Sequence, residues 1–182
     1  MNLPNQLTVL RILLIPIFVI LMMLSEVGAV WSFFATFVFI VASVTDYLDG
    51  YLARKYHLVT AFGKFADPLA DKMLVMSAFI CLVSLGKVSM WIACVIVCRE
   101  LAVTGLRLLL VQDGEVMAAA LPGKIKTATQ MLAIIFLIMN DFPLQMLPFS
   151  IGTILLYSCL VATVYSGVDY FLKNKHVFLQ GM

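Results

Sequence analysis

The sequence predicts an all-α membrane protein, a bundle of six transmembrane helices. Six apolar runs are each close to the roughly 20 residues that cross a bilayer as a helix. Of the 182 residues, 63% are hydrophobic and 12% are charged, which is more apolar than a soluble domain. The runs lack the alternation of a membrane β-barrel, and only helices or closed barrels satisfy the backbone in lipid. The chain therefore contains helices that lipid surrounds.

In chain order, the expected spans are 7–25, 29–50, 65–86, 88–111, 121–140 and 147–171. Turn-forming residues separate them: Ser25-Glu26 with Gly28, the polar stretch 50–64, Gly86-Lys87, Asp113-Gly114-Glu115, and Asp141 to Pro148. Residues 1–8 are polar and interrupted by Pro4, so we expect a short N-terminal segment on the membrane surface. No repeat or soluble insertion is visible, and residues 1–182 are expected to form a single membrane domain.

The positions of lysine and arginine predict the orientation. Six spans place both termini on one side of the membrane, together with the loops at 50–64 and 112–120. Lys87 is expected on the opposite side, which leaves 11 of the 12 Lys and Arg residues on the first side or at helix ends leading to it. By the positive-inside rule, both termini face the cytoplasm. The net charge of +2 is too small to indicate a nucleic-acid partner.

Four aspartates are concentrated within 26 residues of this apolar chain. They are spaced three and four apart, so each pair lies on one face of a helix. If the second and third spans are antiparallel, all four carboxylates come to the same depth near the cytoplasmic face. Carboxylates that crowd together need a cation, and their hard oxygens suit one or two divalent ions of Mg²⁺, Mn²⁺ or Ca²⁺. The residues are Asp46, Asp49, Asp67 and Asp71.

The residues around the aspartates suit a ligand that carries phosphate. Gly50, Ala53 and Gly63 are small enough for a diphosphate to approach the backbone, and Arg54 is placed to pair with an anion. Divalent ions at this site would neutralise diphosphate oxygens, and an aspartate at its edge would take a proton from an attacking hydroxyl. The alternative, in which each aspartate only caps a helix or pairs with a nearby cation, does not account for four carboxylates at these spacings.

This motif resembles the signature of the CDP-alcohol phosphotransferase family, D-x2-D-G-x2-A-R-x8-G-x3-D-x3-D, at all eight fixed positions from Asp46 to Asp71. The resemblance implies a six-helix bacterial enzyme of the cytoplasmic membrane, usually a homodimer, with two Mg²⁺ or Mn²⁺ ions at a site open to the cytoplasm. It implies that Asp46, Asp49 and Asp67 ligate metal, while Asp71 touches metal and acts as general base. Residues expected to bind the CDP-diacylglycerol donor are Asn5, Thr8, Arg11, Asp49, Gly50, Ala53, Arg54 and Gly63.

Basic residues later in the chain indicate a phosphorylated acceptor. The expected second-phosphate pocket consists of Arg99, Arg107, Lys124 and Lys126, with Thr127 beside them. Positive-inside topology is the competing explanation, although Arg99 lies too deep in its span for that explanation to suffice. The resemblance extends through these residues and implies that the phosphatidyl group passes to sn-glycerol 3-phosphate, which releases CMP.

Other readings remain open at this point. Inositol phosphate or serine would serve as acceptor in other enzymes of the same family. A cation transporter would also place carboxylates in a membrane, although usually near the midplane and in repeated halves. A membrane scaffold would give no reason for the aspartate spacing. Metal-dependent CMP release separates these readings.

Overall fold

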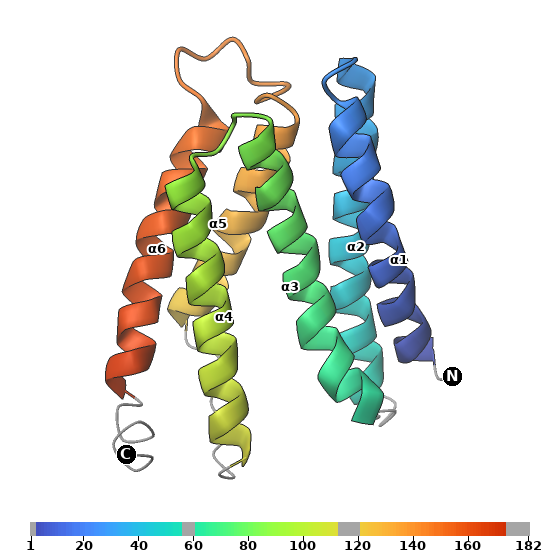
Figure 1. Cartoon of the computed structure of the whole chain (residues 1–182), viewed down its shortest axis with the longest axis vertical. Helices are drawn as coiled ribbons and strands as arrows, with labels where there is room; N and C mark the ends of the chain where they lie inside the picture. Colours follow the sequence, from blue (N-terminus) through green and yellow to red (C-terminus); the bar gives the residue numbers. More distant parts are fainter. Residues whose placement is uncertain (1–2, 56–60, 113–120, 174–182) are drawn as a thin grey trace. The chain divides into compact units, whose positions relative to one another are not determined.

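The computed structural model describes residues 3–55, 61–112 and 121–173, with side chains at 5–46, 69–107, 123 and 125–173. These residues form six α-helices and no strand, as the sequence predicted (Figure 1). The chain divides into two compact units, one with the first three helices and residues 138–140, the other with the remaining helices. The helices are α1 (Leu3–Leu24), α2 (Ala29–Lys55), α3 (Ala61–Ser84), α4 (Met90–Gln112), α5 (Leu121–Ile138) and α6 (Ile151–Lys173).

The separate N-terminal surface segment predicted from residues 1–8 is wrong. Helix α1 begins at Leu3 and runs unbroken through these polar residues. Pro4 falls in the first turn, where backbone N–H groups have no acceptor within the helix, so that the N–H missing from proline costs nothing. The polar residues therefore belong to the first helix, and Thr8 is buried within it.

The predicted loop at 50–64 is also wrong at both ends. Helix α2 continues to Lys55 and α3 already begins at Ala61, so that Gly50 and Gly63 both lie within helices. A glycine inside a helix costs only about 1 kcal/mol, and its neighbours Leu52 and Ala53 are strong helix formers. All eight fixed positions of the signature motif therefore lie on helices.

The end of α3 matches the predicted break at Gly86-Lys87. Gly86 has a φ of 68°, a left-handed conformation that glycine adopts without a steric penalty. The Gly86 N–H donates to the Val83 carbonyl and the Lys87 N–H donates to the Leu82 carbonyl. These two bonds form a Schellman motif, which satisfies carbonyls at the helix end.

In the first unit, α1 packs against both α2 and α3, and α2 also contacts α3. Phe18 of α1 and Phe39 of α2 are fully buried with ring centroids 5.7 Å apart. Alanines such as Ala42 and Ala78 are also fully buried. Small residues allow close backbone approach, so that these helices associate by van der Waals packing as lipid-embedded helices do.

In the second unit, α4 packs against α6. The N-terminal end of α6 is hydrogen-bonded to the segment that follows α5. The Gly152 N–H donates to Asp141 Oδ1 at 2.6 Å. A Cβ added at Gly152 would lie 3.1 Å from both Asp141 Oδ1 and Leu137. Asp141 therefore satisfies an N-terminal amide of α6 as a helix cap does, and glycine permits the close contact.

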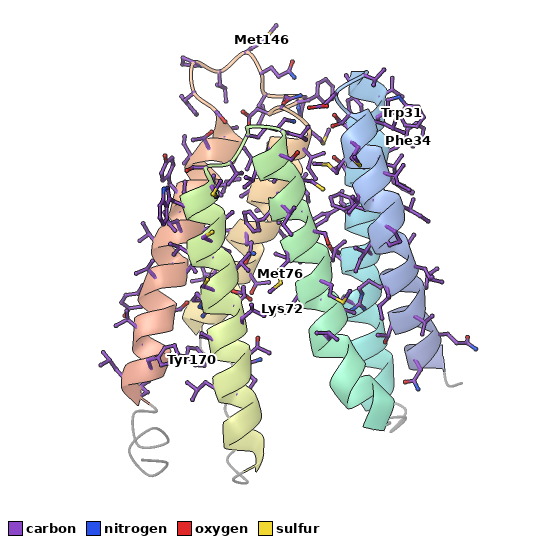
Figure 2. The ribbon with its side chains drawn as sticks, viewed as in Figure 1. Trp31, Phe34, Lys72, Met76, Met146 and Tyr170 are labelled. Carbon is purple, nitrogen blue, oxygen red and sulfur yellow. The ribbon has the colours of Figure 1, made fainter. Side chains whose placement is uncertain are left out.

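Three described helical stretches are long and apolar enough to cross a membrane: Asn5–Leu24, Ala29–Asp46 and Ile151–Lys173. Ile125–Ile138 is a shorter apolar helix. Trp31 and Phe34 lie near the N-terminal end of α2 and are partly exposed (Figure 2). Their ring centroids are 6.2 Å apart. Aromatic side chains in this position are typical of a membrane interface. The protein is therefore a helical membrane protein.

The buried aromatic pair of the first unit can be tested by truncation. Phe39→Ala should lower the free energy of unfolding in detergent by roughly 3 kcal/mol, because it leaves a cavity against Phe18. The matched control is Phe37→Ala, since Phe37 is 66% exposed on the same helix. Thermal unfolding should show a large shift for Phe39→Ala alone. Equal shifts for both variants would contradict the observed packing.

Candidate active site

The signature aspartates lie on two antiparallel helices of the first unit (Figure 1). Asp46 is nine residues before the end of α2, and Asp71 is ten residues after the start of α3. At about 1.5 Å per residue, both are roughly 14–15 Å from their helix ends. Asp49 and Asp67 lie nearer those ends in the same two helices, although their side chains are outside the described part of the chain. Asp46 and Asp71 therefore lie at similar distances from the adjacent ends of α2 and α3, and Asp49 and Asp67 both lie nearer those ends.

Asp46 is held by a buried cation from the first helix. Arg11 Nη1 donates to Asp46 Oδ1, and the Arg11 side chain is fully buried while that of Asp46 is 38% exposed. A guanidinium this deep requires an anionic partner, because an unpaired buried charge is costly. Arg11 thereby fixes one carboxylate oxygen of the signature.

Asp71 lies on α3 with its carboxylate about one quarter exposed. Its Oδ2 is 3.1 Å from Nζ of Lys72, the next residue along the helix. Lys72 is labelled on α3 in Figure 2, one turn before Met76. The Asp71 carboxylate is therefore partly accessible, and it forms an ion pair with the Lys72 ammonium group.

The described aspartates fit a divalent ion. Both carboxylates are partly exposed, come from neighbouring helices and offer hard oxygen ligands of the type that Mg²⁺ and Mn²⁺ prefer. No group of three potential metal ligands occurs among the side chains that the structure describes. The side chains of Asp49 and Asp67 lie outside this described part, so the four-aspartate site stays a prediction.

The residues predicted to bind the donor's nucleotide follow one side of α1. Asn5, Thr8 and Arg11 are spaced three apart, and burial increases along the series from half-buried Asn5 to fully buried Thr8 and Arg11. Gly50, Ala53, Arg54 and Gly63 lie in α2 and α3, outside the range of described side chains. Their predicted contacts therefore stay predictions.

The second unit contains a buried cluster of charged side chains, with Glu100 at its centre. Lys126 Nζ donates to Glu100 Oε1, and Arg99 Nη1 donates to the same oxygen at 3.0 Å. The exposed fractions of these side chains are 2% for Lys126, 5% for Glu100 and 13% for Arg99. The structure thus brings together two of the cations predicted for the acceptor's phosphate.

Helix α6 completes the surroundings of Arg99. The sequence pattern did not predict that residues of α6 contact this arginine. Arg99 Nη2 donates to Ser166 Oγ at 2.7 Å, and the guanidinium carbon lies 6.0 Å from the centre of the Tyr170 ring. A Cβ on Gly167 would come within 3.2 Å of Arg99 Cγ. The sequence signal for this contribution was the polar Ser166 and Tyr170 with the small Gly167, about one turn apart near the end of an expected span.

Two other residues predicted for the acceptor's phosphate, Arg107 and Thr127, are exposed and lie apart from the described contacts of this cluster. Arg107 is exposed on α4. Thr127 is exposed on α5, where its hydroxyl donates to the Gly123 carbonyl at 3.0 Å. The side chain of Lys124 is outside the described residues. Among the described side chains, the charged cluster therefore contains Arg99, Glu100 and Lys126.

Comparison with known proteins identifies the class to which this fold and its aspartate motif belong. The model of the family described as CDP-alcohol phosphatidyltransferase matches residues 1–165, and the chain belongs to this family.

Relatives named CDP-diacylglycerol–glycerol-3-phosphate 3-phosphatidyltransferase are similar over almost the whole chain. The protein from Bacillus subtilis is 47% identical over 183 residues, covering 95% of each chain. The protein from Rickettsia typhi is 37% identical over 178 residues, covering 97% of this chain and 99% of its own. The protein from Haemophilus influenzae is 37% identical over 186 residues, covering 100% and 97%.

The pairing of Arg11 with Asp46 can be measured by a double-mutant cycle. Arg11→Met and Asp46→Asn should show a coupling energy of about 1–3 kcal/mol in thermal unfolding with EDTA present, because they share a partly buried ion pair. The matched control is Lys173→Met with Asp169→Asn, an exposed pair one turn apart at 2.8 Å. That pair should couple by less than about 0.5 kcal/mol. Additive effects at Arg11 and Asp46 would contradict the pairing.

Proposed function

We propose that this protein transfers the phosphatidyl group from CDP-diacylglycerol to sn-glycerol 3-phosphate, giving phosphatidylglycerophosphate and CMP. The observation that carries this proposal is the complete aspartate signature, from Asp46 to Asp71, in a chain that matches named relatives end to end. The chain is thus an enzyme of phosphatidylglycerol biosynthesis. Inositol phosphate and serine remain the alternative acceptors to exclude.

The donor is assigned to the first unit. Asp46, Asp49, Asp67 and Asp71 would hold two divalent ions, Mg²⁺ or Mn²⁺, which when bound would supply positive charge to the diphosphate oxygens. Arg11 orients Asp46 through its ion pair. Asn5, Thr8, Gly50, Ala53, Arg54 and Gly63 complete the proposed contacts to the nucleotide and diphosphate.

The reaction then needs one proton acceptor. Asp71 is assigned this role because its carboxylate is accessible on α3. As Asp71 takes the proton of the acceptor's primary hydroxyl, that oxygen bonds to the phosphorus that bears diacylglycerol. The bond from this phosphorus to the bridging oxygen breaks, and CMP leaves with the electron pair. Holding both reactants in line contributes much of the rate in such transfers.

The acceptor's phosphate is assigned to the second unit. Arg99 and Lys126 are the described cations that come together there, and Arg107, Lys124 and Thr127 are proposed to extend the site. A phosphorylated acceptor accounts for cations at this depth, whereas serine or glycerol would not need them. This assignment favours glycerol 3-phosphate over an unphosphorylated alcohol.

The membrane arrangement is proposed from the charge pattern. All six helices are assigned as spans of a single domain, 1–182, in the bacterial cytoplasmic membrane, with both termini and the active site facing the cytoplasm. The acyl chains of CDP-diacylglycerol would remain in the surrounding lipid. A homodimer is proposed from family resemblance.

Acceptor choice is the decisive test. Purified protein in detergent should release CMP from CDP-diacylglycerol with glycerol 3-phosphate and Mg²⁺, and EDTA should abolish release. Inositol phosphate and serine are offered in parallel as matched acceptors. Release with one of these alone would keep the family chemistry and overturn the proposed acceptor.

The role of Asp71 can be tested by an isosteric substitution. Asp71→Asn should lower the rate of CMP release by at least about 100-fold, because the amide cannot accept the hydroxyl proton. The matched control is Asp169→Asn on α6, which removes a carboxylate from an exposed ion pair. Unfolding temperatures should show that both variants are folded. A folded Asp71→Asn variant with the wild-type rate would refute the general-base assignment.

A further inference from the structure

Glu100 lies at the centre of the charged cluster but has no assigned role in the proposed reaction. It lies on α4, is 4% exposed, and accepts bonds from both Arg99 and Lys126 on its Oε1 atom. Two cations that share one carboxylate oxygen leave the trio with a net charge of +1. Such a group is costly in a membrane protein unless it serves a purpose or finds a further anion.

The cluster also has more donors than the described residues accept. Arg99 Nε is buried and has no hydrogen-bond partner among the described residues. The same holds for Nε2 of Gln130, which is 3% exposed and lies one turn beyond Lys126 on the buried face of α5. Buried polar nitrogens are nearly always paired in folded proteins. Unpaired donors beside surplus positive charge favour a ligand rich in acceptor oxygens.

A phosphate monoester meets these requirements. It carries close to two negative charges near neutral pH and offers three acceptor oxygens. Added to the trio of Arg99, Glu100 and Lys126, it would bring the local charge to about −1 instead of +1. Without Glu100, two adjacent buried cations would repel each other and separate.

We infer that Glu100 is a positioning residue for the acceptor's phosphate: its carboxylate holds Arg99 and Lys126 at the spacing that one phosphate group requires. This inference rests on the proposed function, since it assumes that the acceptor is phosphorylated. Helix α6 fixes the other side of Arg99 through Ser166 and the Tyr170 ring. The guanidinium is therefore oriented from two helices before any acceptor binds.

The test is a substitution that keeps the charge of Glu100 and moves its position. Glu100→Asp retains the carboxylate but withdraws it by one methylene, so the cations stay neutralised while their spacing changes. We expect the KM for glycerol 3-phosphate to increase about tenfold, with kcat and the KM for CDP-diacylglycerol little changed. Inorganic phosphate should inhibit the wild-type enzyme competitively with glycerol 3-phosphate, and should lose potency by the same factor in the variant.

A second variant covers the case in which Glu100→Asp does not fold. Ser166→Ala removes one hydrogen bond to Arg99 without changing any charge, and should raise the same KM by about threefold to tenfold. The matched control is Ser158→Ala on the same helix, because Ser158 is exposed and its hydroxyl donates to the Ile154 carbonyl of its own helix. A wild-type KM and wild-type phosphate inhibition in either folded variant would overturn the positioning role.

A binding measurement separates this inference from the proposed function. Inorganic phosphate should raise the unfolding temperature of the wild-type protein and should do so less in Glu100→Asp. Loss of this protection in the variant supports the inference even if the wild-type enzyme uses another phosphorylated acceptor. If the wild-type protein releases CMP with serine alone, or phosphate protects both proteins equally, the inference fails.

Discussion

The structure depends on the pairing of buried charge. Helices in lipid gain little from burying more apolar surface, whereas a charged side chain among them is costly unless an opposite charge meets it. The described residues solve this problem once in each unit. Arg11 meets Asp46 in the first, and Arg99 and Lys126 meet Glu100 in the second. The Arg11–Asp46 and Lys126–Glu100 pairs each join two different helices, so that charge and helix packing are linked.

The proposed four-aspartate site and the charged cluster of the second unit would have opposite surplus charge, and this matches the chemistry proposed for them. If the four signature aspartates come together as proposed, their negative charge exceeds the charge of Arg11, and divalent cations would balance it. The second cluster has two cations against one carboxylate and calls for an anion. A transferase that joins a metal-bound diphosphate to a phosphorylated alcohol needs both kinds of site. A cation transporter would have no use for the second.

Small residues determine how close the polar groups come. Gly167 lets α6 approach the Arg99 side chain, and Gly152 lets the start of α6 reach the Asp141 carboxylate. Both glycines are sites of close packing rather than of unusual backbone conformation. In each case a Cβ would require the partner side chain to shift by a few tenths of an ångström, so glycine allows the close contact.

The sequence alone determined the helical class, the spacing of the aspartates and the family, because hydrophobic run length and motif spacing are local properties. It misplaced the ends of the helices around residues 1–8 and 50–64, since polarity marks where a chain leaves lipid and not where a helix ends. It also predicted Arg99 and Lys126 as ligands without their partner. Only the tertiary structure decided that Glu100 and Ser166 hold these cations, because α4, α5 and α6 bring together residues 26 and 67 positions apart.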